Sequence, residues 1–379
     1  MSVLAILGLT VCTVAYCGVC YAILSAAFVE RFARRAISAT ADYPPVSILK
    51  PLYGEEPGLL ENLATFCVQD YPAPVQIVCG VHDPLDTAVA AVERLRVLHP
   101  GVDITLVADA SRHGSNAKVS NLINMLPSAR HNLLLLSDSD IAVPPDYLRR
   151  VVDALALPGV GAVTCLYTGK PLGGLAAQLS AMGIDYHFLP NVLTGISLGL
   201  AKPCFGSTIA LDRVVLEQIG GLQSFASVLA DDYEIGRAVR AKGLGVTFPA
   251  FAVGHTCSDK TIGEWLAHEL RWARTIRVVD PAGHAGSIVT HAIPLALLGA
   301  ILSGFTLFAT ACLVTSVAAR AVLKWRIDQC FGCNGGPLWL LPLRDVLSFG
   351  VFLASLVGGS VEWKGERLRV ERSGALWKS

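Results

Sequence analysis

The chain has 379 residues, of which 53% are hydrophobic and only 16% are charged, a low charge content for a soluble protein. This length predicts two or three domains. The formal net charge is zero, so no overall electrostatic field favours nucleic acid as a partner. The basic residues gather instead beside long apolar stretches, which favours a protein that works at a lipid bilayer.

The first apolar stretch, residues 3–28, contains no charged residue and is long enough to cross about 30 Å of hydrocarbon as a helix. Arg31, Arg34 and Arg35 follow it, and the positive-inside rule places them in the cytoplasm with the N-terminus outside. A cleaved signal peptide is the alternative, but no basic segment precedes the stretch, and the stretch is longer than a signal core. We therefore predict a retained transmembrane anchor over residues 1–35.

Residues 44–280 contain alternating strand and helix patterns, which predict one α/β domain. Strands are predicted at residues 46–49, 75–81, 102–107 and 133–136. Helical patterns lie between them, at residues 59–68, 87–98 and 117–126. The last predicted strand is four consecutive leucines, which indicates burial on both faces. Strands that alternate with helices predict a doubly wound, mostly parallel sheet, in which ligands bind beyond the carboxyl ends of the strands.

Acidic residues directly follow two of the predicted strands. Asp83 follows the strand at 75–81, and Asp138 and Asp140 follow the leucine strand. Alternate carboxylates at a strand end can bind one Mg²⁺ or Mn²⁺ ion, which prefers oxygen ligands and shares them with substrate phosphates. We predict that Asp138 and Asp140 bind the metal and that Asp83 hydrogen-bonds a uracil or ribose. Turns with solvated acids are the alternative, especially for Asp83, which precedes Pro84.

The starts of two predicted helices carry further charged residues, one helix a lysine and the other a pair of acids. Asn116 and Lys118 open the helical pattern at 117–126, and a helix N-terminus with a lysine can bind a diphosphate, although a capped surface helix is the alternative. Asp231 and Asp232 begin another helical pattern, where the helix dipole favours acids in any case. In the functional interpretation, Asp232 removes the proton from an attacking hydroxyl and Asp231 supports its orientation.

A further helical pattern, residues 265–276, is amphipathic and contains His268, Arg271 and Trp272. Arg271 can reach a phosphate, and Trp272 can stack under a sugar or an acceptor. Anchoring to a lipid surface is the competing role, because Trp and Arg also suit an interfacial helix. We predict that all three side chains serve catalysis.

The segment 171–204 is rich in Leu, Gly and Ala, but Asp185, His187 and Pro190 interrupt it, so it does not form a clean span. We predict helices that lie in the membrane interface within the α/β domain. An ordinary buried helical hairpin is the alternative.

Two later apolar blocks predict a C-terminal membrane region over residues 286–361. The block at 288–319 is either one long tilted helix or a tight pair of shorter helices. The block at 338–361 contains Arg344 and Asp345, an adjacent pair that is costly inside a span unless it faces protein or water. We therefore expect this block to enter the membrane only after Asp345.

Basic residues flank this last block on both sides. Arg320, Lys324 and Arg326 are interpreted as a basic loop before it, and residues 362–379 as a basic tail after it. The positive-inside rule places both in the cytoplasm, which a single crossing between them cannot satisfy. The number of C-terminal crossings therefore stays open at this point.

As an ordered set, these motifs resemble the ceramide glucosyltransferase family, membrane-embedded enzymes with a GT-A glycosyltransferase core. The resemblance covers nearly the whole chain and rests on Asp70–Pro72, His82–Asp83, Asn116–Leu122, Asp138–Asp140, Gly220–Leu222, Asp231–Tyr233, Arg271–Trp272 and Trp363–Arg367. It implies an inverting transfer from a UDP-sugar to a lipid hydroxyl on the cytoplasmic side. It also implies that Asp83 contacts the nucleotide, Asp138 and Asp140 the metal, and that Asp232 acts as the base.

Two departures from the family pattern bear on the acceptor. The family usually has Gln or Arg where this chain has His268, and eukaryotic ceramide members keep only the acid that corresponds to Asp138. The chain looks more like the bacterial hopanoid-biosynthesis glycosyltransferases, which add N-acetylglucosamine to bacteriohopanetetrol. We expect that reaction, with ceramide glucosylation as the alternative, in a multi-pass protein of the bacterial inner membrane whose catalytic domain is cytoplasmic.

Two other classes share some of these features. A processive polysaccharide synthase has similar acids, but it would have Gln at position 268 and more spans to form a channel. A non-catalytic membrane scaffold would keep the fold and bind neither UDP nor metal.

Overall fold

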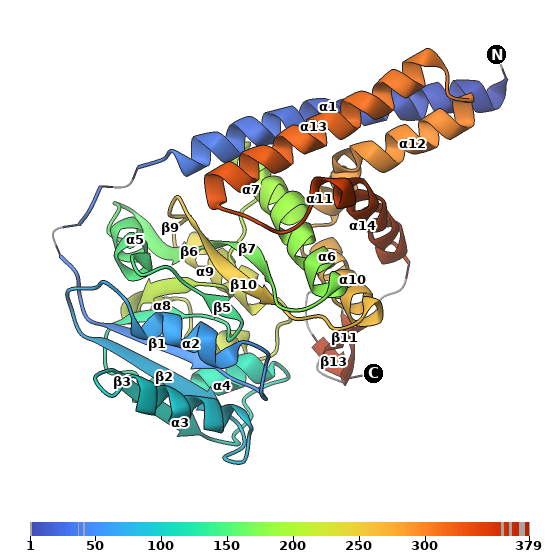
Figure 1. Ribbon diagram of the computed structural model, residues 1–379. Coiled ribbons are helices and arrows are strands. Elements are labelled where there is room, and N and C mark those ends of the chain that lie inside the picture. Colours follow the sequence, from blue (N-terminus) through green and yellow to red (C-terminus); the bar gives the residue numbers. More distant parts are fainter. Residues whose placement is uncertain are drawn as a thin grey trace. The chain divides into compact units, whose positions relative to one another are not determined.

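The computed structural model describes residues 2–36, 38–40 and 42–357, together with the backbone of residues 360–363, 366–370 and 376–378 (Figure 1). The chain forms two compact units that interleave along the sequence. The sheet unit contains residues 36–167, 202–256 and 369–379, and the helical unit contains residues 1–35, 168–201 and 257–368.

The sheet unit contains a seven-stranded sheet with the order β3-β2-β1-β4-β8-β6-β9. Its strands are β1 (Val46–Pro51), β2 (Val75–Val81), β3 (Asp103–Ala108), β4 (Leu133–Leu136), β6 (Val160–Thr164), β8 (Ile209–Asp212) and β9 (Gly245–Thr247). Strands β3, β2, β1 and β4 are parallel to one another, with Val46 opposite both Val75 and Leu133. Strand β8 runs antiparallel to both β4 and β6. The predicted mostly parallel sheet is confirmed, with one antiparallel strand inserted near its centre.

Helices cover both faces of this sheet, as in a doubly wound fold. One apolar layer includes α2 (Leu59–Cys67), α3 (Ala88–Leu98) and α5 (Tyr147–Leu155). The other includes α4 (Ala117–Met125), η1 (Leu126–Ser128), α8 (Arg213–Gln218), η3 (Leu222–Phe225) and α9 (Asp231–Ala241). The leucine strand serves both layers: Leu133 and Leu135 pack into the first, and Leu134 and Leu136 into the second. Its predicted burial on both faces is therefore confirmed.

A small second sheet lies after the leucine strand. Strand β5 (Ile141–Ala142) pairs antiparallel with β10 (Ala252–Cys257), so that Ile141 lies opposite His255. Strand β7 (Leu166–Pro171) lies where the chain passes from one unit to the other. This pairing brings His255 beside the loop that carries Asp138 and Asp140.

Three long apolar segments of the helical unit pack side by side: α1 (Val3–Ala33), α12 (Ala292–Ser303) and α13 (Leu307–Phe331) (Figure 1). Small residues allow the close approach, because a Cβ atom on Gly8 would lie 2.7 Å from the backbone nitrogen of Ser303. The block predicted at 288–319 divides at Gly304, which adopts a left-handed φ of 65° and ends α12. It therefore contains two helices rather than one long span.

The rest of the helical unit consists of shorter elements. The segment 175–197 is one continuous helical run, α6 (Leu175–Gly183), η2 (Ile184–Phe188) and α7 (Leu189–Ser197), with a π-helical turn in the middle rather than a hairpin bend. Further along are α10 (Ile262–Val279), α11 (Pro281–Gly286), η4 (Ser287–Thr290), η5 (Leu338–Leu340) and α14 (Leu341–Ser355). The C-terminal strands are β11 (Ser360–Trp363), β12 (Glu366–Val370) and β13 (Leu376–Lys378).

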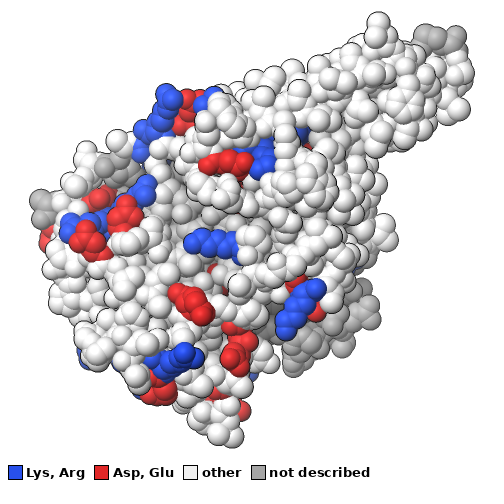
Figure 2. Space-filling view, viewed as in Figure 1, with Lys and Arg blue, Asp and Glu red and all other residues white. Residues whose placement is uncertain are grey.

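Three helical segments within the described residues are long and apolar enough to cross a membrane: Val3–Ala33, Leu307–Phe331 and Leu338–Ser355. A fourth exists if the pair Pro281–Thr290 and Ala292–Ser303, bent by 61°, counts as one span. The arm formed by α1, α12 and α13 shows a surface largely without charged side chains in Figure 2. These features fit the predicted membrane association at both ends of the chain. Side chains of the predicted basic tail lie outside the described residues.

The interpretation of Arg320, Lys324 and Arg326 as a loop is wrong, because all three lie within α13. Arg320 and Lys324 are almost fully buried and form ion pairs with Asp345 and Asp328, respectively. Pairing with acids of the same unit replaces the water that a loop would have supplied.

An adjacent pair of opposite charges inside a span was expected to face either protein or water. Arg344 and Asp345 face protein. Asp345 binds Arg320, and the guanidinium of Arg344 donates to Glu269 at 2.8 Å and to the carbonyl oxygen of Leu179 at 2.8 Å. Arg344 and Asp345 therefore lie inside a continuous helical segment, Leu338–Ser355, and each forms an ion pair there.

Candidate functional site

The loop after β4 is held by backbone hydrogen bonds on both sides. The backbone N–H of Ser137 donates to the carbonyl oxygen of Leu49 at 3.1 Å, and that of Asp138 donates to the carbonyl oxygen of Gly206, also at 3.1 Å. The chain then passes through Ser139 and Asp140 into β5. Because both neighbours are buried parts of the sheet unit, the two acids of this loop have fixed positions at the carboxyl end of the leucine strand.

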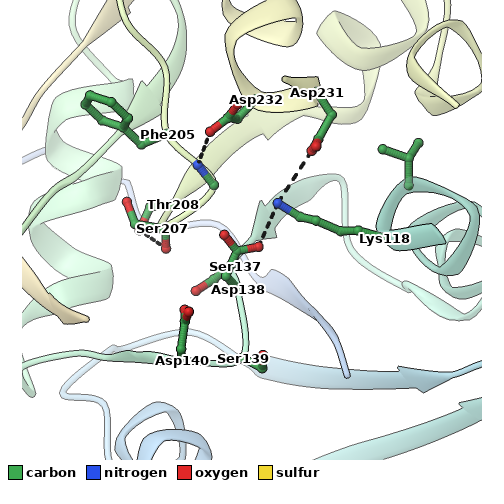
Figure 3. A network of polar contacts seen from close by, with 12 residues as sticks. Lys118, Ser137, Asp138, Ser139, Asp140, Phe205, Ser207, Thr208, Asp231 and Asp232 are labelled. Carbon is green, nitrogen blue, oxygen red and sulfur yellow. Dashed lines mark hydrogen bonds and ion pairs between the residues drawn. The ribbon is translucent and has the colours of Figure 1, made fainter. Parts of the chain in front are cut away.

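Lys118 lies between two of the acids, as Figure 3 shows. Its Nζ atom is 2.6 Å from Oδ1 of Asp138 and 3.4 Å from Oδ2 of Asp231. Burial alone would lower the pKa of Lys118, but Asp138, Asp231 and Asp232 together outweigh it and raise this pKa above its usual value. The lysine is therefore a stable cation at the centre of an acidic cluster.

Asp232 is oriented by two backbone N–H groups. That of Gly206 donates to Oδ2 at 2.9 Å, and that of Tyr233 donates to Oδ1 at 2.8 Å. Burial and the neighbouring charge of Asp231 raise the pKa of Asp232 to about 6, with Lys118 opposing them. A carboxylate with this pKa is ionised at neutral pH and still basic enough to accept a proton during a reaction.

Gly206 connects Asp138, the predicted metal ligand, with Asp232, the predicted base. Sequence reasoning missed this residue. Its carbonyl oxygen accepts from the backbone N–H of Asp138, while its own N–H donates to Asp232, so the two backbone groups of one residue set the spacing of both acids. The glycine lies in the run Phe205–Thr208, just before β8. A glycine ahead of a buried strand was the only available signal, and it points equally well to an ordinary turn.

Asp231 has different partners from Asp232. Its Oδ1 accepts from the side-chain amide of Asn116 at 3.1 Å, and its Oδ2 faces Lys118. Asn116 also caps α4, because its side chain accepts from the N–H of Val119. The starts of α4 and α9 are thus tied to each other through these groups, which holds the lysine and the candidate base together.

Lys50 is a second residue that sequence reasoning missed. It lies in β1 with no solvent exposure, and its Nζ atom contacts Oγ of Ser137 at 3.2 Å and the carbonyl oxygen of Asp138. The ammonium also lies 4.1 Å from the ring centre of Phe66. Burial lowers its pKa to about 8, against the opposing charges of Asp140 and Asp138. In the sequence, its position in an apolar strand was the only indication of a role. The contacts show that it supports the loop that carries Asp138 and Asp140.

Asp138 and Asp140 supply oxygen ligands that fit a divalent cation. Oδ2 of Asp140 lies 3.2 Å from Nε2 of His255, while its Oδ1 is buried without a hydrogen-bond partner in the described part of the chain. Burial would raise the pKa of Asp140, but His255 and Lys50 outweigh it and lower this pKa to about 2. An ionised carboxylate with an unsatisfied buried oxygen is a good cation ligand.

The protein alone does not complete a metal site. Across the described residues, no group of three or more His, Cys, Asp or Glu side chains could hold a metal ion. Magnesium sites of enzymes commonly use one or two carboxylates and take their remaining ligands from water and substrate phosphates. Asp138 and Asp140 match that pattern, so the fit depends on a phosphate-bearing substrate.

Asp83 lies at the carboxyl end of β2, two strands from β4 in the same sheet. It is exposed, and its Oδ1 accepts from the backbone of Leu85 at 2.8 Å, which is the turn interpretation of this residue. Beside it, the His82 ring bridges the carbonyl oxygens of Asp109 and Ala117. Asp83 therefore lies at the same carboxyl edge of the sheet as Asp138, and its contact with a nucleotide stays a prediction.

His268, Arg271 and Trp272 lie on α10, within the helical unit. The Nδ1 atom of His268 is 3.5 Å from Oδ1 of Asp259, and its ring packs edge-to-face on Trp272 with the ring centres 4.5 Å apart. The predicted helix is confirmed, and it extends over Ile262–Val279. The catalytic roles of these three side chains stay predictions.

Gly206 should not tolerate a larger residue. A Cβ atom at this position would lie 2.5 Å from Oδ2 of Asp138 and 2.7 Å from Nζ of Lys118, so both side chains would have to move. We expect Gly206→Ala to lower kcat/KM about a hundredfold, because misplacement by about 1 Å costs that much in oriented catalysis. The control is Gly101→Ala, where a Cβ atom would meet nothing within 4 Å. Equal activity of the two purified variants would contradict the role assigned to Gly206.

Comparison with known proteins supports the fold. The structure resembles that of a mannosyltransferase from Pyrobaculum calidifontis, solved in complex with GDP-Man and Mn²⁺, with a TM-score of 0.53 and 22% sequence identity. The match covers 93% of this chain and 98% of the other. At this identity the likeness concerns the fold alone, and it confirms the predicted GT-A-like arrangement of the sheet unit.

Two sequence relatives have names of enzymes that glycosylate lipids. The chain is 25% identical over 275 residues to ceramide glucosyltransferase 1 of Caenorhabditis elegans, which covers 70% of this chain and 58% of that protein. It is 26% identical over 208 residues to the beta-monoglucosyldiacylglycerol synthase of Synechocystis, which covers 52% of this chain and 40% of that protein. The matched regions thus span only about half of these relatives.

The family model for glycosyl transferase family 21 matches residues 10–376, which is nearly the whole chain. It includes the acidic loop after β4, the Lys118 helix, the start of α9 and the apolar helices at both ends. The chain therefore belongs to glycosyl transferase family 21.

Proposed function

We propose that this protein is an inverting glycosyltransferase that moves a sugar from a UDP-sugar to a hydroxyl group of a membrane lipid. The observation that carries the proposal is the pairing of two acids of different character through Gly206. Asp138 lies against a lysine at the end of a parallel strand, and Asp232 has a pKa near neutrality. One acid suits a cation-bound leaving group, and the other suits a base.

The donor would bind at the carboxyl edge of the sheet. Asp83 would hydrogen-bond the uracil or ribose, and Lys118 would contact the diphosphate. Asp138 and Asp140 would hold Mg²⁺ or Mn²⁺, which neutralises charge on the departing diphosphate when it is bound. Support for the metal comes from the buried Oδ1 of Asp140, which has no hydrogen-bond partner among the described residues, and from the oxygen-only chemistry of the two ligands.

The acceptor hydroxyl would lose its proton to Asp232 while its oxygen attacks the anomeric carbon. A new carbon–oxygen bond forms as the bond between that carbon and the β-phosphate oxygen breaks, so UDP leaves with both bonding electrons. Attack opposite the leaving group inverts the anomeric configuration. The two N–H donors to Asp232 hold its carboxylate in one orientation, which favours a single direction of approach.

The helical unit would hold the enzyme in the bilayer where its acceptor resides. Its candidate spans would provide the anchor of a multi-pass protein, in bacteria at the inner membrane, and the positive-inside rule applied to Arg31, Arg34 and Arg35 supports a cytoplasmic sheet unit. The segment 171–204 would lie in the interface. Lipid and donor would thus meet without the lipid leaving the membrane, assisted by His268, Arg271 and Trp272 on α10.

The favoured reaction transfers N-acetylglucosamine to bacteriohopanetetrol. The complete Asp-Ser-Asp loop and His268 favour this acceptor over ceramide, because eukaryotic ceramide members keep only the first acid and the family usually has Gln or Arg at the position of His268. Ceramide glucosylation is the second candidate, and the names of relatives from Caenorhabditis elegans and fungi favour it. The two candidates differ in donor and acceptor and use the same catalytic groups.

Purified protein should convert lipid to glycolipid when it is incubated with Mn²⁺, UDP-N-acetylglucosamine or UDP-glucose, and either bacteriohopanetetrol or ceramide. Mass spectrometry of the lipid extract identifies both sugar and acceptor in one experiment. We expect the hopanoid product carrying N-acetylglucosamine. A polymer would instead indicate a processive synthase, and the absence of both products together with absent UDP binding would indicate a non-catalytic scaffold.

A further inference from the structure

Lys118 occupies a position that a bound cation would be expected to take. Its ammonium lies against Asp138 and Asp231 (Figure 3). The charge of Asp232 also acts on it. Three carboxylates so close together would repel one another strongly without a positive charge among them. The protein therefore carries its own counter-cation inside the acidic cluster, before any substrate arrives.

The lysine and a divalent metal would have to share Asp138. Oδ1 of this residue is engaged by Lys118 at 2.6 Å, and its Oδ2 faces Gly206, leaving little room on that side. Asp140, by contrast, has a buried Oδ1 that accepts no hydrogen bond from any of the described residues. The carboxylate of Asp140 would thus be available to the metal, whereas the charge of Asp138 is already neutralised by Lys118.

We propose that Lys118 competes with the divalent metal for Asp138 and transfers its charge to the diphosphate when the nucleotide sugar binds. This inference rests on the proposed function and extends it to the order of binding. In the free enzyme the ammonium weakens metal binding through repulsion between two cations and through its claim on Asp138. The incoming diphosphate offers Lys118 an anionic partner, which releases Asp138 to the metal.

Binding of the nucleotide should therefore strengthen binding of the metal. Part of this coupling depends on Lys118 and would be lost if the lysine were replaced. Because coupling between two ligands is reciprocal, the metal should also strengthen nucleotide binding. An enzyme built in this way loads metal and donor together. It does not hold a metal tightly without substrate.

The test measures Mn²⁺ affinity without nucleotide, by the electron paramagnetic resonance signal of free Mn²⁺. We expect Lys118→Met to bind Mn²⁺ about tenfold more tightly than the natural protein, because a repelling charge is gone. Lys118→Gln, which keeps a donor to Asp138 without the charge, should show the same gain. Lys118→Arg keeps the charge and should bind Mn²⁺ as weakly as the natural protein. Lys242→Met, at an exposed position after α9, is the control and should change nothing.

The same variants are titrated with UDP in the absence of metal, where Lys118→Met and Lys118→Gln should bind it more weakly. Unchanged or weaker Mn²⁺ binding in both uncharged variants would overturn the proposal, as would the absence of Mn²⁺ binding by every variant with UDP present. These failures differ from failure of the proposed function. Glycolipid synthesis by the natural protein, with equal Mn²⁺ affinity in all variants, would leave the function standing and remove only the competition.

Discussion

Asp232→Asn should lower kcat for sugar transfer by about 10²–10⁴-fold, which is the range that general base catalysis contributes. Asparagine keeps the shape of the side chain, and its single amide oxygen can still accept the N–H of Gly206, while the N–H of Tyr233 loses its acceptor. Asparagine cannot accept a proton from the acceptor hydroxyl at neutral pH. We therefore expect the loss in kcat, measured by release of UDP, while the KM for the donor changes little.

The pH dependence of kcat provides an independent test of Asp232 as the base. The folded pKa of Asp232 is raised to about 6, by burial first and by Asp231 second. Above pH 6 the carboxylate is ionised and can act as the base, so activity should be nearly constant there. Below pH 6 it becomes protonated, and log kcat should fall by about one for each pH unit, since one proton blocks the base. The acid limb should disappear in Asp232→Asn, leaving only the residual rate.

Glu234→Gln is the matched control, because Glu234 lies on the same helix and pairs with Arg237 at the surface. Its activity should equal that of the natural protein, since surface pairs contribute little. Near-normal turnover of Asp232→Asn would refute the base assignment. Equal losses in Asp232→Asn and Glu234→Gln would point to damage to α9 as a whole.

Strand periodicity predicted the parallel half of the sheet but missed β8. The strands β1, β2, β3 and β4 each follow or precede a helical pattern and carry long apolar runs, which local rules interpret well. Strand β8 has four residues, Ile209–Asp212, and it pairs with β4, whose last residue lies more than seventy positions earlier. Its direction depends on how the chain returns from residues 168–201, and no local pattern contains that information.

The candidate site divides in a similar way. Asp138, Lys118 and Asp232 were predicted because each stands at the end of a strand or the start of a helix, where the chain necessarily exposes side chains to a ligand. Gly206 and Lys50 act through backbone groups: one donates its N–H to Asp232, and the other contacts the carbonyl oxygen of Asp138. Contacts of that kind form only when the chain folds, so they cannot be predicted from residue type alone.

Charge patterns in the apolar segments gave the weakest prediction. A local reading treats Arg320 as the end of a span, because an isolated charge there is costly in hydrocarbon. The partner that makes Arg320 tolerable, Asp345, lies twenty-five residues later on another helix. The sequence contained both residues, but only the packing of α13 and α14 shows that they neutralise each other.

Removing one member of the Arg320–Asp345 pair should destabilise the protein by about 3–5 kcal/mol, since it leaves a buried charge unpaired. The pair is bidentate, with nitrogen–oxygen distances of 2.7 and 2.8 Å, and both side chains are about 5% exposed or less. We expect Asp345→Leu and Arg320→Met to lower the unfolding temperature in detergent micelles, followed by tryptophan fluorescence. Each variant should also show less folded protein after extraction.

The double variant, Arg320→Met with Asp345→Leu, distinguishes the unpaired charge from a loss of packing. Apolar replacement of a whole buried pair is often neutral, so the double variant should recover most of the stability that either single variant loses. Arg34→Met breaks the exposed pair with Glu30 on α1 and should cost about 1 kcal/mol or less. If the double variant were as unstable as the sum of the single variants, the two charges would be uncoupled. Arg320 and Asp345 would then contribute through separate contacts rather than as one ion pair between α13 and α14.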